Sequence, residues 1–164
     1  MVSRKETQFI CEAAIEAHHS PVLMRHGALA VSNGRILARG YNHYRSRSSD
    51  NIMNGGCTCH AECDVLHKLI KLPRRPKRVT MYITRIGIAG ELRESAPCHN
   101  CYEKMLFFGI KTLIFTLTAS PGKRTPRKGS IFNHCLHINP ISSSLPTTFF
   151  KNLHLAADGP LLMT

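Results

Sequence analysis

Apolar positions at helical spacing open the chain. They recur three and four residues apart, so on a helix they share one face, and they are Phe9, Ile10, Ala13, Ala14 and Ala17. Ser3, followed three residues later by Glu6, forms a capping box, which satisfies free N–H groups at a helix start. The pattern predicts a helix from Ser3 to about His18, with its apolar face in the core.

Two short β-type stretches come next, at residues 28–31 and 36–39, and four turn residues separate them. The turn contains Asn33-Gly34, and an Asn-Gly pair between such stretches is a strong hairpin signal because both residues accept positive φ. We therefore expect an antiparallel hairpin from Gly27 to Tyr41, which contributes the first two strands of a sheet.

The middle of the chain alternates between helical and strand patterns. We expect a helix from about Cys59 to Leu72, a strand from Val79 to Thr84, a helix from Pro97 that stops at Gly109, and a strand from Ile110 to Leu117. The last of these is almost entirely apolar, which is typical of a strand that is buried on both faces. Such alternation predicts the α/β class, here a three-layer α/β/α sandwich with a mixed central sheet.

Three regions carry no periodic pattern: residues 43–58, residues 85–94 and everything after 117. In the last region Pro, Ser, Thr and Gly dominate, and we expect no helix or strand before Phe149 and at most a short element at 150–155. The predicted organisation is one domain of residues 1–117 and a basic, irregular tail of residues 118–164. Whether that tail is disordered or becomes ordered on a partner stays open.

Charge and cysteine usage indicate the kind of partner and the cellular environment of the protein. The 164 residues include 22 Lys and Arg against 10 Asp and Glu, a net charge of +12, which favours anionic partners over a merely solvated basic surface. An odd count of 7 cysteines favours metal binding in a reducing compartment over disulfides. Without a long apolar run, we expect an intracellular protein, cytoplasmic or nuclear, with no membrane partner. A homo-oligomer stays open.

Candidate chemistry gathers in two segments. His60, Cys98 and Cys101 offer one imidazole and two thiols, and catalytic zinc sites use three protein ligands. The two cysteines are three positions apart, so one helical turn places both on one face, and Pro97 suits the first turn of that helix. Glu62 is a carboxylate that need not bind the metal and can carry protons instead.

The segments Cys59-His60-Ala61-Glu62 and Pro97-Cys98-His99-Asn100-Cys101 resemble the signature of zinc-dependent cytidine and deoxycytidylate deaminases. The resemblance extends over roughly residues 25–117, and cysteine directly before His60 is similar to the deoxycytidylate branch. It implies a cytidine-deaminase-like fold, a bound Zn²⁺, and hydrolytic conversion of cytosine to uracil in a nucleoside or nucleotide. It also implies that Glu62 carries the protons, Asn42 holds the sugar, and the backbone N–H of Ala61 contacts the base carbonyl.

The chain departs from that pattern in places that concern the substrate. Asp64 stands where the deoxycytidylate enzymes usually have asparagine, and residues 85–94 are longer than the usual connection. One alternative is therefore a deaminase that acts on cytosine or adenine in single-stranded DNA or RNA. A third class, a non-catalytic zinc module that binds nucleic acid, has no need of the carboxylate of Glu62.

Several cations are candidates for phosphate or nucleic-acid contacts. Arg45 and Arg47 lie beside a histidine and a tyrosine in the 43–58 loop, while Arg74 and Arg75 belong to the basic run 71–78. The alternative in each case is a solvated connection.

Three further cysteines could hold a second metal or be reduced thiols near the first. We favour reduced thiols, because one intervening residue is not the usual spacing between zinc ligands, and these residues are Cys57, Cys59 and Cys63.

Overall fold

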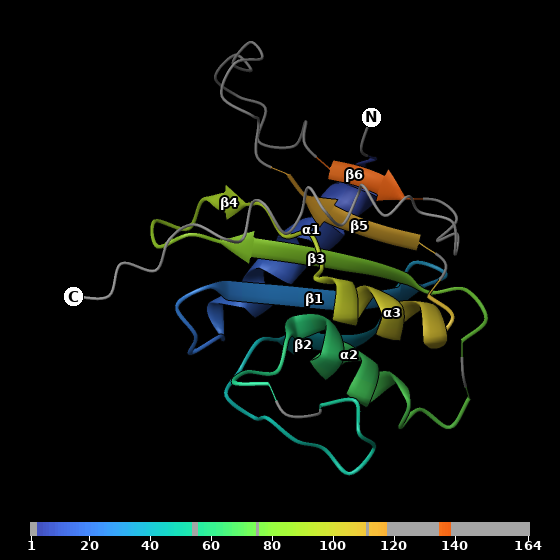
Figure 1. Cartoon of the computed structure of the whole chain (residues 1–164). Helices are drawn as coiled ribbons and strands as arrows, with labels where there is room; N and C mark the ends of the chain where they lie inside the picture. The colour runs from blue at the N-terminus through green and yellow to red at the C-terminus, as the bar shows by residue number, and fades with distance from the viewer. Residues whose placement is uncertain (1–2, 54–55, 75, 111, 118–134, 139–164) are drawn as a thin grey trace.

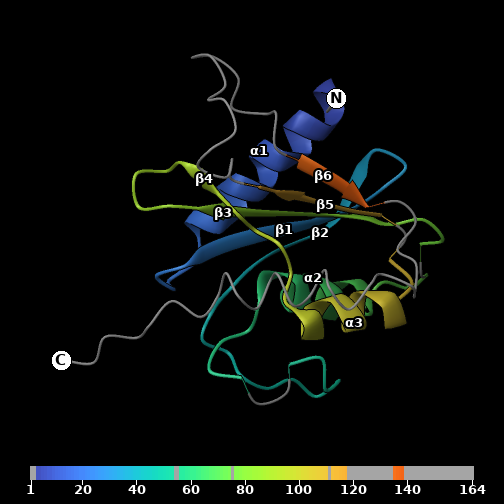
Figure 2. The same cartoon turned by 45° about the horizontal axis from the view of Figure 1, so that its top comes forward.

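A six-stranded sheet lies between two layers of helices. The computed structural model describes residues 3–53, 56–74, 76–110, 112–117 and 135–138. The strands are ordered β2-β1-β3-β5-β6, and β4 pairs with β3 beside that path. Helix α1 covers one face, and α2 and α3 cover the other (Figures 1 and 2). This arrangement confirms the predicted three-layer sandwich. Among the described residues, no helix is both long enough and apolar enough to cross a membrane.

Helix α1, Arg4–His18, begins with the predicted capping box. The Glu6 carboxylate accepts a hydrogen bond from the Ser3 N–H at 2.7 Å, and the Ser3 hydroxyl accepts one from the Glu6 N–H at 3.3 Å. The buried face of the helix lies directly on the first strand: a Cβ at Gly27 would be 2.0 Å from the carbonyl oxygen of Ala13. Glycine is therefore required at this contact.

The predicted hairpin is present as β1, Arg25–Ser32, and β2, Arg35–Tyr41. Asn33 and Gly34 both have positive φ, 50° and 74°, as the turn chemistry requires. Strand β1 also pairs antiparallel with β3, Thr80–Ile86. Because side chains alternate along a strand, one set of central residues packs against α2 and α3 and the other set packs against α1.

Strand β5, Thr112–Thr116, runs parallel to β3, and α3 forms the crossover between them. Its middle residues are fully buried, as the apolar pattern predicted. The region 85–94, whose role was open, forms a hairpin with β3 through the two-residue strand β4, Leu92–Arg93.

One expectation about the C-terminal region is wrong. Strand β6, Cys135–Ile138, pairs antiparallel with β5, although we expected no strand before Phe149. Four residues are too few for a periodic signal, and this strand forms on the otherwise unpaired edge of β5. Residues 150–155 lie outside the described residues, and the division at residue 117 stays a prediction.

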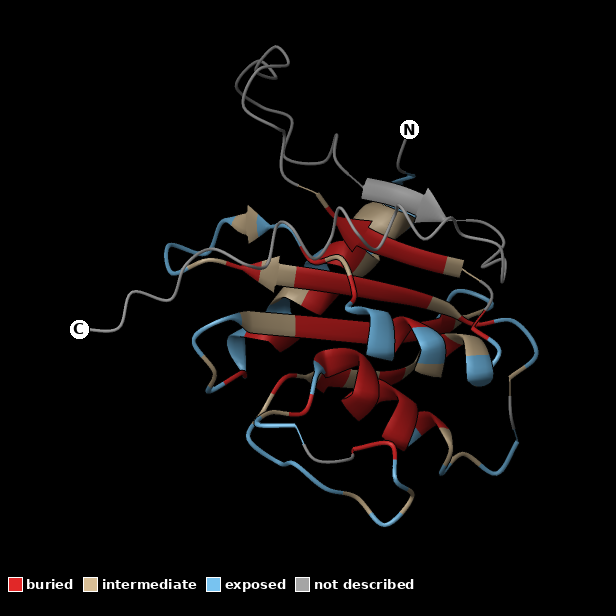
Figure 3. Cartoon of the chain, viewed as in Figure 1, coloured by how far each residue is buried: buried red, intermediate tan, exposed pale blue. Residues whose placement is uncertain are grey.

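Helices α2, Ala61–Leu69, and α3, His99–Phe107, are shorter than predicted. Nearly every residue of α2 is buried (Figure 3). The expected place of Pro97 in the first turn of a helix is wrong, because it precedes Cys98, the N-cap residue of α3. In α2 the corresponding N-cap is His60.

Candidate active site

The three predicted metal-binding residues stand at the starts of two packed helices. His60 and Cys98 are N-cap residues with extended backbone, at φ −75° and ψ 152° and at φ −69° and ψ 161°. Cys101 lies one turn further along α3 and is buried. The N-terminus of a helix favours a thiolate because the helix dipole is positive there.

The three side chains converge on one point. His60 Nδ1 is 3.3 Å from Cys101 Sγ and 3.6 Å from Cys98 Sγ, and all three ligand atoms lie within 4.8 Å of one another. A tetrahedral zinc ion with usual Zn–N and Zn–S bond lengths separates its ligand atoms by about 3.4–3.8 Å. The residues therefore fit zinc in both chemistry and spacing.

The Cys98 thiol and the His60 imidazole shift each other's pKa. Hydrogen bonds with Cys101 and with His60 lower the pKa of Cys98 to about 3. The same partnership with Cys98 raises the pKa of His60 to about 9. The pair is thus a thiolate and an imidazolium that must give up its proton when a metal ion binds. Contacts with Cys63 and Cys98 raise the pKa of Cys101.

Glu62 lies in the first turn of α2 and is only 4% exposed. Burial raises the pKa of its carboxyl group, while the charge of His60 acts in the opposite direction. A carboxyl group whose pKa is raised towards neutrality can both accept and release a proton near working pH. The site thus places a buried carboxyl group within electrostatic reach of His60 and Cys98, and its role as the proton carrier stays a prediction.

Asn42 has a structural role that sequence reasoning ranked second. Its side-chain N–H donates to the Met24 carbonyl at 2.7 Å, and its side-chain oxygen accepts from the His26 N–H at 2.7 Å. The residue is buried and ties the end of β2 to the start of β1. One N–H and one lone pair of the amide remain for other partners, so the contact with a sugar stays a prediction.

The other predicted contact residues occupy different environments. Ala61 is fully buried as the first residue of α2, and its contact with a base stays a prediction. Arg45, Arg47 and Arg74 are exposed, and Arg45 Nε donates to the Arg47 carbonyl at 3.1 Å. Arg75 lies outside the described residues.

The three additional cysteines do not assemble a second site. In the part of the chain that the structure describes, the metal-binding residues above form the single group with suitable spacing. Cys59 Sγ donates to the His60 carbonyl at 3.3 Å, Cys63 Sγ lies 3.8 Å from Cys101 Sγ, and Cys57 is exposed. These positions agree with their interpretation as reduced thiols near the metal.

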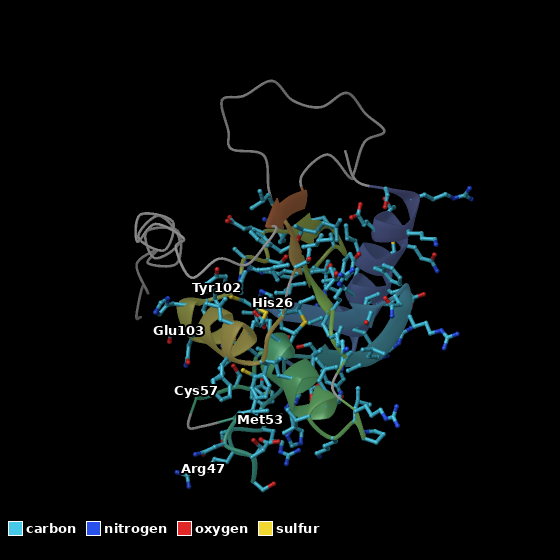
Figure 4. The ribbon with its side chains drawn as sticks, turned by 90° about the vertical axis from the view of Figure 1, so that its right-hand side faces the viewer. His26, Arg47, Met53, Cys57, Tyr102 and Glu103 are labelled. Carbon is cyan, nitrogen blue, oxygen red and sulfur yellow. The ribbon has the colours of Figure 1, made fainter. Side chains whose placement is uncertain are left out.

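The 43–58 loop forms one wall of a cavity beside the metal-binding residues, and sequence reasoning missed the residues that hold it. His67 on α2 hydrogen-bonds the Asp50 carboxylate, and Lys104 Nζ on α3 donates to the Ile52 carbonyl at 2.8 Å. The cavity has a volume of about 90 Å³. Figure 4 shows Arg47, Met53 and Cys57 along this loop. No local signal marks such anchors, because each joins residues distant in sequence.

Asp64 shows why a departure from the usual pattern is tolerated. Its carboxylate accepts a hydrogen bond from Lys68 Nζ at 2.8 Å and one from the Tyr41 N–H at 3.4 Å. It therefore joins α2 to the end of β2 and is not among the grouped metal-binding residues.

Solved structures of deaminases share this fold. The dCMP deaminase of cyanophage S-TIM5, in complex with dCMP and dUMP, is 21% identical with a TM-score of 0.54, and the match covers 71% of this chain and 84% of that one. Its apo form is 24% identical with a TM-score of 0.52, over 69% and 82%. The cytidine deaminase of Burkholderia pseudomallei is 18% identical with a TM-score of 0.53, over 86% and 96%.

Comparison of the sequence with protein families identifies the family of the chain. No curated protein sequence matches the chain. Residues 4–117 match the model of the cytidine and deoxycytidylate deaminase zinc-binding region, a span that contains all three metal-binding residues and Glu62. The chain therefore belongs to the cytidine and deoxycytidylate deaminase family and is a zinc-dependent hydrolytic deaminase.

Proposed function

We propose that this enzyme converts cytosine to uracil in a free nucleoside or nucleotide, with deoxycytidylate as the leading candidate. The observation that carries the proposal is the meeting of His60, Cys98 and Cys101 beside the buried carboxyl group of Glu62. The cysteine before His60, which is similar to the deoxycytidylate branch, supports the choice of nucleotide.

His60, Cys98 and Cys101 would hold the zinc ion. When bound, zinc lowers the pKa of a water ligand towards neutrality and so supplies a nucleophile. Glu62 would accept a proton from the attacking water and deliver it to N3 of the ring. It would then take the proton of the new hydroxyl group at C4 and give it to the amino group. The reaction consumes one water, breaks the bond from C4 to the amino nitrogen, forms the C4 carbonyl and releases ammonia.

Two further residues would position the substrate. Asn42 has one N–H and one lone pair left after its bonds to the Met24 carbonyl and the His26 N–H. We expect these to meet a sugar hydroxyl. The N–H of Ala61, at the start of α2, would donate to the base carbonyl, where the helix dipole favours partial negative charge.

A second candidate is deamination of cytosine or adenine within single-stranded DNA or RNA. The net charge of +12 favours it, as do the exposed side chains of Arg45, Arg47 and Arg74. Binding through phosphates weakens steeply with salt, with a log–log slope of about −0.7 per neutralised phosphate for single strands.

Ammonia release distinguishes these candidates. Zinc-loaded enzyme would be assayed with deoxycytidine, deoxycytidylate, a cytosine-containing single strand and their adenine counterparts. We expect turnover of a free cytosine compound, and loss of that turnover in Glu62→Gln with zinc retained. Inert free substrates together with a deaminated strand would replace the leading candidate by the second one.

A further inference from the structure

A row of basic side chains crosses the sheet at one end. In the strand register, His26 of β1 stands opposite Arg85 of β3, which in turn stands opposite Arg93 of β4. Residues directly opposite each other in antiparallel strands point to the same face. Ile83, two residues before Arg85, packs in the core cluster under α2 and α3, whereas Leu92 packs in the cluster under α1. The row therefore faces the layer that carries the metal-binding residues.

The row is also near the metal centre along the sheet. The backbone N–H of Asn42 donates to the His26 carbonyl at 3.1 Å, which places His26 beside a predicted substrate residue. Burial and the charges of Arg85 and His60 lower the pKa of His26, so both groups are within electrostatic reach of its ring. Figure 1 shows β4 beside the tip of β3, with the chain running on from β4 into α3. His26, labelled in Figure 4, is half-buried.

The positive charge of this row is only partly compensated. Arg93 Nε donates to the Glu91 carboxylate at 2.7 Å, so that cation has a partner. Within the described residues, Arg85 makes no ion pair, and its Nε is buried without a hydrogen-bond partner. Like charges opposite each other on a sheet are destabilising, and a buried N–H without a partner is costly. Such an arrangement becomes favourable when an anion completes it.

We propose that Arg85, flanked by His26 and Arg93, anchors a phosphate group of the substrate. The guanidinium of arginine presents several donors in a planar fork that matches phosphate oxygens. Arg85 as a whole is only partly buried, so a ligand can reach it. The proposal rests on the proposed function and deepens it, since it requires a substrate that bears a phosphate, either a free nucleotide or a strand.

The proposal gives a role to residues 85–94. Strand β4 comes from that region, contributes Arg93 to the row, and holds the end of β3 through pairing at Arg85 and Ile86. The Arg25 guanidinium secures the turn of the hairpin by donating to the Gly87 carbonyl at 2.6 Å. The hairpin therefore holds Arg85 at the end of β3 that carries the row rather than adding a separate module.

Arg85→Gln tests the proposal, because it removes the charge and keeps a hydrogen-bonding side chain. Ammonia release by the full chain would be measured with deoxycytidine, deoxycytidylate and a cytosine-containing single strand. We expect kcat/KM for the phosphate-bearing substrate to fall about 10- to 100-fold, the usual range for a charged hydrogen bond. The value for deoxycytidine should change less than about threefold. Arg35→Gln, which removes an exposed cation from the far end of β2, is the matched control.

Direct binding keeps the test independent of turnover. Inorganic phosphate and deoxycytidylate would be titrated against wild type, Arg85→Gln and Arg85→Lys, with zinc content and thermal unfolding checked for each. We expect Arg85→Lys to lie between the other two, since it keeps the charge and loses the fork. Should Arg85→Gln fail to fold, the lysine variant carries the same comparison.

The outcomes distinguish a free nucleotide from a strand as the source of the phosphate. They also distinguish failure of the phosphate site from failure of the proposed function. If kcat/KM is higher for deoxycytidylate than for deoxycytidine, and Arg85→Gln removes this difference, the substrate is a free nucleotide. If only the strand shows this difference and its loss, the substrate is a polynucleotide. An equal loss for deoxycytidine and the phosphate-bearing substrates, or no loss for any of them, overturns the phosphate site and leaves the deaminase intact. Absence of turnover with every cytosine compound overturns the proposed function instead, while phosphate binding is still measurable.

Discussion

Replacing Asn42 by alanine should destabilise the fold and leave the metal in place. The amide of Asn42 makes two hydrogen bonds of 2.7 Å from a position that is only 6% exposed. Its loss leaves the His26 N–H without a partner, and an unsatisfied buried donor costs about 1–3 kcal/mol. The Met24 carbonyl still accepts a hydrogen bond from the His26 ring at 3.0 Å. Losing the hydrogen bond from the Asn42 amide to this carbonyl therefore costs only about 0.5–1 kcal/mol.

Together these contributions predict a loss of about 1.5–4 kcal/mol in the free energy of unfolding. Urea denaturation followed by circular dichroism would measure it, with metal analysis on the same samples. Zinc content should be unchanged, because its ligands belong to α2 and α3 rather than to the joined strand ends. Gln8→Ala is the matched control, since it removes an exposed side-chain amide from α1.

Activity adds a second readout for the same variant. If Asn42 also holds the sugar, kcat/KM for deoxycytidine should fall even under conditions where the variant is fully folded. A variant that is as stable as wild type within about 0.5 kcal/mol would refute the structural role. Unchanged kcat/KM in folded protein would refute the sugar contact and leave the structural role standing.

Other predictions follow from the same geometry. Each of the three metal-binding residues, changed singly to alanine, should cost the enzyme its zinc, while Cys57→Ser should retain it by metal analysis; a loss there would show that the site is drawn wrongly. Glu62→Gln should keep zinc and lose at least about a hundredfold in turnover, and substantial residual activity would place the proton carrier elsewhere. Gly27→Ala forces a Cβ to within 2.0 Å of the Ala13 carbonyl oxygen and should cost at least about 1–3 kcal/mol in urea unfolding; an unchanged midpoint would contradict this packing. Burial would raise the pKa of Asp50, but the hydrogen bonds that its carboxylate accepts lower it overall. A lowered folded pKa adds stability above the unfolded value of 3.8 that is lost as pH falls, so Asp50→Asn should reduce the drop in urea midpoint from about pH 7 to about pH 3, and an unaltered drop would argue against it.

The sequence alone determined the features that depend on neighbours within a few residues. The capping box at Ser3 and Glu6 specified the start of α1, and Asn33-Gly34 specified the hairpin, because both act through local backbone geometry. Two of the three predicted metal ligands, Cys98 and Cys101, were identifiable for the same reason, whereas His60 is distant from them in sequence. The two cysteines stand one helical turn apart, so their spacing places both thiols on one side of the helix start.

Helix ends were decided partly by contacts that the sequence does not display. We predicted that α2 would begin at Cys59, but that residue forms an isolated bridge with His43 and so has an extended backbone. His60 becomes the N-cap as a result, and the helix begins at Ala61. Local propensity could not reveal this, because the bridge joins residues on either side of a long loop.

Tertiary structure decided everything that depends on pairing between distant segments. Strands β4 and β6 are too short to give a recognisable sequence pattern. They form because β3 and β5 have backbone groups available for pairing. The bonds of Asn42 and the alignment of His26 with Arg85 likewise arise from strand register. Register is set by how whole strands bury their faces, so a residue's partner across the sheet cannot be read from its own neighbourhood.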